Sequence, residues 1–141
     1  SLDGNTMYLA DSPTSTIFKH DYDKERGSLS NRQVVRKLEV GVPDGSCVDS
    51  EGNIWNAVWR SGAGPSMVQC TDPSTGGVIY TVKVPDATSC ITCCCFGGPD
   101  LDVLFISTAN IGLDREKEPN AGGVYALKLD VRGVPEKRLN F

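Results

Sequence analysis

The sequence predicts an all-β fold made of about three β-propeller blades with four strands each. Helical periodicity is nearly absent, and short apolar or alternating runs are separated by turns rich in Gly, Pro, Asp and Asn. A strand that follows a Gly-containing turn recurs about every fifty residues, at Thr6–Ala10, Ile54–Trp59 and Val103–Thr108. About four strands in such a repeat are typical of a propeller blade. A β-sandwich is the alternative, although it would not require the repeat.

Each repeat continues with a second strand and an acidic turn. The second strands are expected at Thr16–Phe18, Ser66–Gln69 and Gly123–Leu127. The acidic turns are expected at Asp21–Lys24, Thr71–Ser74 and Asp130–Gly133. Outer strands follow from Leu29 onward and at Val78–Val84. The stretch Gln33–Val40 is compatible with a short helix, but the β-branched pair Val34-Val35 favours a strand.

Three blades do not close a propeller, which typically needs at least four. The uncovered sheets would expose apolar surface and strand edges. The chain also lacks an initiator Met and a secretory signal, and it reaches its first strand almost at once. We therefore expect residues 1–141 to be a partial propeller, either a fragment that needs the missing blades or a chain that pairs with a second copy.

The amino-acid composition argues against nucleic acids and membranes as binding partners. With 39% hydrophobic and 23% charged residues, the 141-residue chain is globular in composition. Its net charge of -4 and the absence of a Lys/Arg run argue against nucleic acid. Apolar runs such as Val103–Ile106 are far too short to span a bilayer, so no membrane association is expected.

The six cysteines do not form a metal-binding pattern. Three are consecutive, Cys93 to Cys95, and neighbours on a strand point to opposite faces. A C-x-x-C match at Cys90–Cys93 lacks a second pair, and His20 is the only histidine. The sequence therefore predicts free thiols packed as small hydrophobes in a reducing compartment, which favours a cytoplasmic location.

Several stretches carry a resemblance to a known family when they are taken in order. They are Met7–Ser12, Phe18–Asp23, Leu29–Arg32, Pro43-Asp44-Gly45, Val48–Trp55, Thr92–Gly98 and Ala121–Tyr125. Together they resemble the family of senescence-marker protein (regucalcin), gluconolactonase and luciferin-regenerating enzyme. The resemblance implies a six-bladed propeller of about twice this length, of which this chain would be the C-terminal half. It also implies a divalent cation, often calcium, and hydrolysis of sugar lactones such as gluconolactone.

Only one metal ligand of that family maps onto this chain. The family holds its cation with a Glu near the N-terminus, two Asn in the middle and the Asp of a P-D-G motif, which corresponds to Asp44. One Asn belongs to an N-G-L-x-W-S pattern whose final Ser would be Ser1, so this Asn would lie just upstream. The isolated 141 residues are therefore expected to carry part of an active site and to be inactive alone.

The position of Asp44 suits a metal ligand at the mouth of a propeller tunnel. Pro43 restricts the backbone before it, and Gly45 lets the backbone approach closely. A carboxylate suits Ca²⁺, and Zn²⁺, Mn²⁺ or Mg²⁺ are also possible. The cation would polarise the lactone carbonyl and activate a bound water, while Asp44 assists proton removal as a catalytic residue. Pro-Asp-Gly is also a common turn, so the residues alone leave a structural role open.

Strand order predicts which loops share the Asp44 end of the blades. These are Asp11–Thr14, Trp59–Gly64 and Asn110–Ala121, whereas the Asp49–Asn53 turn is expected at the opposite end. Ser12, Trp59 and Arg60 are candidate contacts for a polyhydroxy substrate, although Trp59 is equally suited to blade packing. The long segment Asn110–Ala121 could form a rim, or it could be an ordinary solvated loop.

Two other functions remain open at this point. One is a non-catalytic calcium-binding or scaffold propeller, and the other is phosphotriester hydrolysis on a similar propeller. An upstream Glu and the two Asn ligands would favour the enzyme, and their absence would favour the scaffold.

Overall fold

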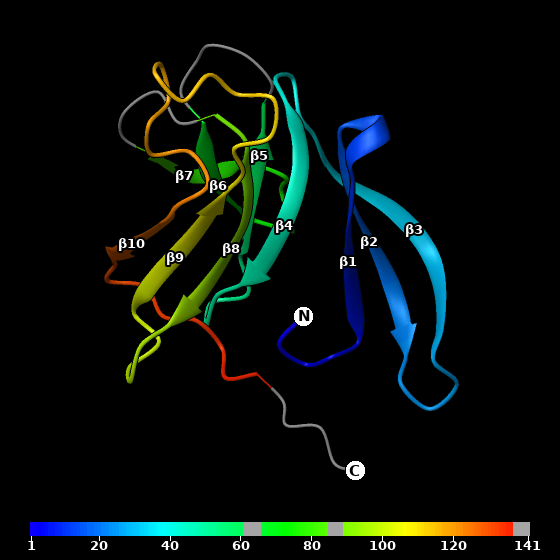
Figure 1. The fold of residues 1–141 in the computed structure, drawn as a ribbon. Helices are drawn as coiled ribbons and strands as arrows, with labels where there is room; N and C mark the ends of the chain where they lie inside the picture. The colour runs from blue at the N-terminus through cyan, green and yellow to red at the C-terminus, as the bar shows by residue number, and fades with distance from the viewer. Residues whose placement is uncertain (61–65, 85–88, 137–141) are drawn as a thin grey trace.

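The computed structural model describes residues 1–60, 66–84 and 89–136, which form three antiparallel sheets (Figure 1). The first sheet has the order β1 (Thr6–Asp11), β2 (Thr16–Asp23), β3 (Ser28–Lys37), and the 3₁₀ turn η1 (Ser12–Thr14) joins its first two strands. The middle sheet is β4 (Val42–Val48), β5 (Ile54–Trp59), β6 (Met67–Thr71), β7 (Val78–Lys83). The third sheet contains β8 (Ile91–Gly97), β9 (Val103–Thr108) and β10 (Val124–Lys128), with β9 in the centre.

The all-β prediction is confirmed, since the described residues contain no α-helix. Nor do they contain a helix long and apolar enough to cross a membrane. Strands β5 and β9 have the predicted bounds, and Gln33–Lys37 is part of β3, as the valine pair indicated. The predicted four strands per unit are found only in the middle sheet, because the first and third sheets have three each.

Two acidic segments behave differently from the prediction. Asp21 lies within β2 rather than in a turn, because it pairs with Thr6 on one side and Ser30 on the other. These cross-strand partners outweigh the weak strand propensity of Asp. After β10, Gly133 forms a bridge with Asp49, and the Ser50 amide donates to the Arg132 carbonyl at 2.8 Å. The end of the described chain therefore returns to the middle sheet.

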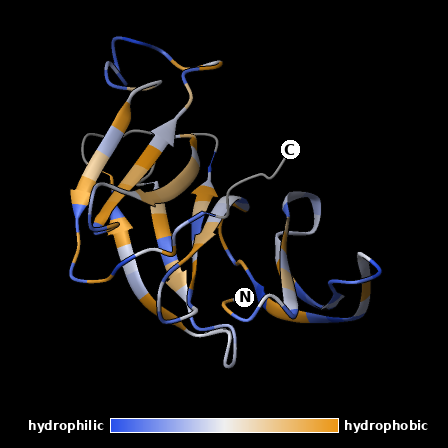
Figure 2. Cartoon of the chain, turned by 90° about the horizontal axis from the view of Figure 1, so that it is seen from below, coloured by the Kyte–Doolittle hydropathy of each residue, from blue (hydrophilic) through white to orange (hydrophobic). Residues whose placement is uncertain are grey.

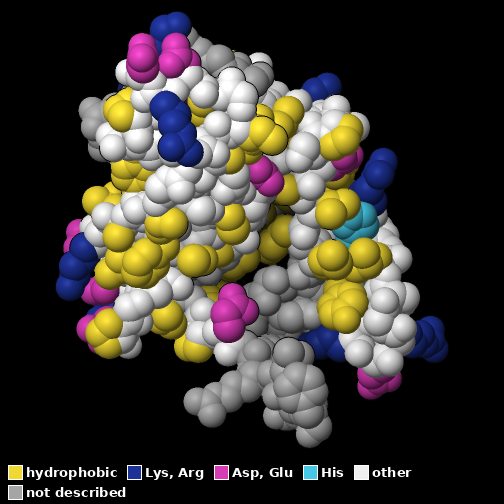
Figure 3. All heavy atoms as spheres, viewed as in Figure 1, with side chains coloured by type: hydrophobic (Ala, Val, Ile, Leu, Met, Phe, Trp, Pro, Cys, Tyr) yellow, Lys and Arg dark blue, Asp and Glu magenta, His cyan; other side chains and the backbone are white. Residues whose placement is uncertain are grey.

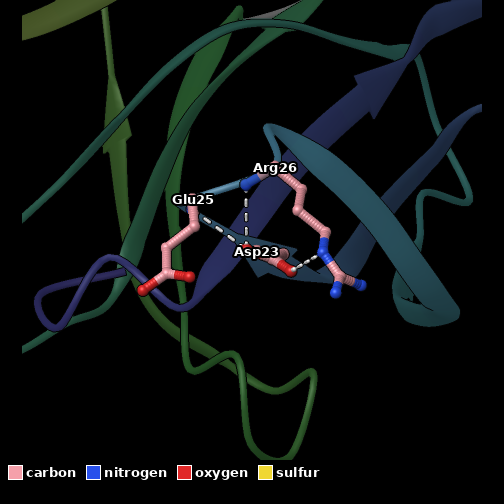
Figure 4. A network of polar contacts seen from close by, with 3 residues as sticks. All are labelled: Asp23, Glu25 and Arg26. Carbon is pink, nitrogen blue, oxygen red and sulfur yellow. Dashed lines mark hydrogen bonds and ion pairs between the residues drawn. The ribbon is translucent and has the colours of Figure 1, made fainter.

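The hairpin between β2 and β3 shows how an acidic side chain stabilises one of the turns. The Asp23 carboxylate accepts hydrogen bonds from the backbone amides of Glu25 and Arg26, at 2.9 and 3.0 Å (Figure 4). The Arg26 side chain also lies 3.8 Å from the same carboxylate. Since these groups are exposed, the ion pair adds little to stability, and the turn geometry comes from the backbone hydrogen bonds.

Strand β5 of the middle sheet is buried on both faces, which explains its continuous apolar pattern. One face packs on the first sheet through Ile17, Val35, Leu38, Ile54 and Val58. The other face packs on the third sheet through Trp55, Ala57, Val68, Cys70, Ile91, Cys94, Leu104 and Ile106. Alternate residues of β5 serve the two cores, as the period of a strand requires. In Figure 2, hydrophobic colour lies mainly on the strands of the middle and third sheets, and the strands of the first sheet are more mixed.

A hollow separates the lower part of β1 from β4. It has a volume of about 570 Å³, and its lining includes Met7, Tyr8 and Val48. Hydrophobic side chains are visible along this hollow in Figure 3. The first and middle sheets are therefore in close contact through their core residues but stand apart along the inner side of β1.

The turn between β4 and β5 depends on Asp49, which is only 1% exposed. Its carboxylate accepts hydrogen bonds from the backbone amides of Glu51 and Asn53, at 3.0 and 2.8 Å. It also accepts from the Asn53 side chain at 3.2 Å and from the Trp55 indole at 2.8 Å. The structural role predicted for this turn is confirmed, and the carboxylate also positions a core tryptophan.

Replacement of Asp49 with Ala should therefore destabilise the fold strongly. The change leaves a buried indole N–H and two backbone amides without their acceptor, so we expect a loss of about 3 kcal/mol or more in the free energy of unfolding. Urea unfolding of the complete protein, followed by tryptophan fluorescence, measures this loss. Asp72→Ala is the matched control, because Asp72 accepts similar turn hydrogen bonds from Ser74 and Thr75 in an exposed hairpin. Equal losses in the two variants would contradict the special role of Asp49.

Candidate metal and substrate site

Asp44 lies on a β-bulge near the start of β4. Pro43 pairs with Val58 and Ser46 pairs with Asn56, so Asp44 and Gly45 together face the single residue Ala57. Proline has no amide hydrogen and restricts its own φ, which favours an interruption of the ladder at this point. A bulge of this kind locally bends a strand and re-aims its side chains.

Gly45 is required because β4 approaches β8 closely at the bulge. A Cβ atom added at Gly45 would lie 2.5 Å from the Cys93 sulfur and 2.7 Å from the Cys93 Cα. Neither distance is tolerated, and the backbone of β8 cannot easily retreat. The Pro-Asp-Gly sequence therefore places Asp44 directly beside the neighbouring sheet.

Three polar side chains fix the backbone around Asp44. The Asn56 amide donates to the Asp44 carbonyl at 2.9 Å and to the Ser46 hydroxyl oxygen at 2.7 Å. The Ser46 hydroxyl donates to the Asp44 carbonyl at 3.1 Å. From the first sheet, the Ser12 hydroxyl donates to the Pro43 carbonyl at 2.7 Å. These hydrogen bonds hold the bulge from both sides.

The Asp44 carboxylate itself has no such partners. Within residues 1–60, 66–84 and 89–136, no other side chain hydrogen-bonds it and no cation pairs with it. Burial raises the pKa of Asp44, and a hydrogen bond from the Gly45 amide partly opposes this increase. Asp44 is thus a partly desolvated anion held on a rigid backbone, which is a favourable starting point for binding a cation.

The structure brings three of the predicted site residues together. Ser12, Asp44 and Trp59 line one open cavity of about 320 Å³, together with Val42. Arg60 lies next to it, in a second cavity of about 320 Å³ that shares Trp59 and Val42. Since the Ser12 hydroxyl proton is already donated to Pro43, this residue acts first in fixing the start of β4.

The predicted rim segment is tethered at the same end of the sheets. The Arg60 carbonyl accepts a hydrogen bond from the Cys90 amide at 3.3 Å, and the Cys90 carbonyl accepts one from Ala109 at 2.9 Å. The Glu118 carboxylate accepts from the Ser89 amide at 2.6 Å and from its hydroxyl at 2.7 Å. The segment after β9 is therefore anchored near Arg60, while Ser61–Gly64 of the predicted loop lie outside the described residues.

This donor set fits part of a site for a hard cation. Among the described residues, no three His, Cys, Asp or Glu side chains lie close enough together to hold a metal ion. Asp44 supplies one free carboxylate of the type that Ca²⁺ prefers. The described part of the chain thus offers a single strong ligand, and a complete coordination shell would need oxygens from elsewhere.

Sequence reasoning missed Asn56, which is 1% exposed and holds the bulge. Its Oδ1 atom is buried without a hydrogen-bond partner, an uncommon state for an amide oxygen. The available signal was one amide within the otherwise apolar strand Ile54–Trp59. That signal indicates a buried polar role but does not say which carbonyl the amide contacts.

The fold and the site together define an all-β protein in which the Asp44 carboxylate, without a side-chain hydrogen bond from the described residues, lies on a bulge near the start of β4. Residues 1–110 match the family model described as SMP-30/Gluconolactonase/LRE-like region. The chain therefore belongs to the SMP-30/gluconolactonase/LRE-like family, as the sequence resemblance indicated.

Individual relatives support the same family. The chain is 42% identical to regucalcin of Gallus gallus over 142 residues, which is 96% of this chain and 45% of that protein. Its structure is similar to a luciferin-regenerating enzyme, with a TM-score of 0.81, 33% identity and coverage of 95% of this chain and 45% of the other. The structure is also similar to that of a calcium-binding protein, regucalcin of Agrobacterium tumefaciens, with a TM-score of 0.79 and 31% identity. The match covers 97% of this chain and 47% of the other. The chain thus spans about half the length of the relatives it matches.

The desolvation of Asp44 predicts a pH-dependent effect on stability. Burial raises the pKa of Asp44 in the folded state above its unfolded value of about 3.9. The contribution of Asp44 to the free energy of unfolding is therefore fully present below the unfolded pKa, and it is lost as pH rises through the folded pKa. The neutral variant Asp44→Asn should therefore be more stable than the unchanged protein at pH 7, and equally stable near pH 3.

Thermal unfolding of the complete protein with chelator present, at both pH values, tests this sign. Asp100→Asn, in the exposed turn before β9, is the control and should show no such difference. A variant Asp44→Asn that is less stable at pH 7 than the unchanged protein would refute the inferred desolvation.

Proposed function

We propose that this chain contributes one half of a divalent-cation-dependent hydrolase that opens sugar lactones such as gluconolactone. The observation that supports this most directly is the Asp44 carboxylate, which is partly desolvated, lacks a cationic partner in the described residues and sits on a rigid bulge. Family membership supplies the chemical class.

The proposed architecture is the C-terminal half of a six-bladed propeller. In its support, the chain covers only 45% of the chicken regucalcin chain. The sheets of three, four and three strands leave β1 and β10 at unpaired edges within the described structure. Such edges favour pairing with further strands, so we propose that the other half of the protein, or a second copy, completes the ring. The remaining metal ligands would come from there.

In this proposal Asp44 binds the cation through its ionised carboxylate, while Asn56 and Ser12 keep the backbone on either side in place. The bound cation would supply electrostatic stabilisation of the developing charge on the lactone carbonyl oxygen. In this proposal Asp44 also assists proton removal from an attacking water, with the bound cation supplying most of the activation, because an Asp carboxylate is by itself a weak base.

The cavity residues next to Asp44 suit a polyhydroxy substrate. Trp59 offers a flat apolar face for the carbon side of a sugar ring, and it borders both cavities. Arg60 offers hydrogen-bond donors in the adjoining cavity for ring oxygens or hydroxyls. The Arg60 backbone carbonyl accepts a hydrogen bond from the Cys90 amide, so Arg60 is held at the edge of the sheets with its side chain outside the core.

Calcium is the favoured cation because the ligand is a hard oxygen and because the similar Agrobacterium protein is described as calcium-binding. Zn²⁺, Mn²⁺ and Mg²⁺ remain competing ions for the same carboxylate. The same description supports the second candidate function, a calcium-binding propeller without catalysis. Both functions use Asp44, and they differ in whether bound cation leads to lactone hydrolysis.

Replacement of Asp44 with Ala in the complete protein separates these possibilities. We expect the affinity for Ca²⁺, measured by calorimetry, to fall at least about tenfold, and gluconolactone hydrolysis to fall by about 10² or more. Chelator should abolish the activity of the unchanged protein, and added Ca²⁺ should restore it.

Asp100→Ala is the control and should retain both properties. Unchanged metal affinity in Asp44→Ala would refute the ligand assignment. Tight binding of Ca²⁺ by the unchanged protein without lactone hydrolysis would favour the non-catalytic function.

A further inference from the structure

Two thiols from different sheets meet in the core between β4 and β8, which lie side by side (Figure 1). The sulfur atoms of Cys47 and Cys94 are 4.0 Å apart. A disulfide bond is about 2.05 Å long, so the two atoms need to approach by about 2 Å. The two strands already approach closely beside this pair, because a Cβ atom at Gly45 would lie 2.7 Å from the Cys93 Cα.

The two thiols differ in their access to solution. Cys94 is 2% exposed, and its sulfur also lies 3.4 Å from the Trp55 carbonyl oxygen. The contact with Cys47, together with burial, raises the pKa of Cys94 well above its ordinary range. Cys47 is half-buried and lines two cavities of about 570 and 440 Å³. Of these two thiols, Cys47 is therefore the one that a small oxidant reaches from solution. Cys94 is too buried to react with bulky thiol compounds.

We propose that Cys47 and Cys94 form a reversible oxidation site. A hydroperoxide oxidises the two thiols, and they form an intramolecular disulfide. The Cys47 sulfur attacks the peroxide O–O bond, a sulfur–oxygen bond forms, and water or an alcohol leaves. The Cys94 sulfur then attacks the Cys47 sulfur, the sulfur–oxygen bond breaks, and a second water carries away the Cys94 proton. In total two thiols lose two electrons and two protons, and one hydroperoxide is reduced.

Proximity makes Cys94 the resolving partner despite its high pKa. It already touches the Cys47 sulfur, and an oriented intramolecular reaction proceeds as if its partner were highly concentrated. The other buried thiols are less suitable. Cys70 lies beyond Trp55, which separates it from Cys47 across the sheet. Cys90 lies at the rim, where its sulfur contacts the Arg60 carbonyl oxygen.

The test uses the complete protein with Cys93→Ser and Cys95→Ser, which remove the two exposed thiols. After treatment with hydrogen peroxide, free thiols are counted in denaturant and the intact mass is measured on one portion. A second portion is blocked with iodoacetamide, and its unreduced tryptic peptides are mapped by mass spectrometry. We expect the loss of two thiols, a decrease of about 2 Da in the unblocked intact mass, and a link between the peptides of residues 38–60 and 84–115. Dithiothreitol should reverse all three changes.

Variants Cys47→Ala and Cys94→Ala in the same background should form no link. The mapping is repeated in the complete protein without the serine substitutions in case the serine variants fold poorly. A link from Cys47 to Cys70 or Cys90 would overturn the assignment. So would retention of all thiols, or oxidation of Cys47 to the sulfinic acid while Cys94 stays reduced.

Discussion

The buried Asp49 carboxylate is the interaction on which most of the structure depends. It accepts four hydrogen bonds, one of them from the Trp55 indole, and thereby fixes the largest side chain of the core. Trp55 in turn packs edge-on against Phe96 of β8 at 5.5 Å and stacks on Tyr80 of β7 at 6.2 Å. Through Trp55, this one turn residue is thus connected to the outer strand of the middle sheet and to the third sheet.

This constraint extends to the candidate site because β4 is short. Asp49 anchors one end of the strand, and Asp44 lies at the other end, only five residues away. Between them, Gly45 presses against β8 and the Asn56 amide holds the bulge, so β4 has little freedom to shift. Asp44 therefore keeps its position next to the third sheet, although no other side chain of the described residues hydrogen-bonds its carboxylate. A ligand that is positioned through its backbone remains free to bind, which is what a preorganised metal site requires.

The sequence was sufficient for features that depend on local pattern. Apolar runs and turn residues predicted β5 and β9, and the two acidic turn signals on either side of one short strand predicted that Asp44 and Asp49 lie near its opposite ends. Features that depend on distant partners were not predictable. The length of β2 requires knowledge of its neighbours on both sides, and the return of Gly133 to Asp49 joins residues far apart in the chain. The same holds for Asn56, whose partner becomes apparent only when the bulge is known.

The two acidic residues of β4 and its turn differ in how their oxygens are used. Both are aspartates beside turns, and their local sequences give similar turn signals. The Asp49 carboxylate accepts hydrogen bonds from four protein donors, so its oxygens are not available to bind a ligand. At Asp44 the pattern is reversed, because the backbone carbonyl takes the hydrogen bonds of Asn56 and Ser46 while the carboxylate remains partly desolvated. The distribution of donors, rather than the turn motif, therefore separates a structural aspartate from a candidate ligand.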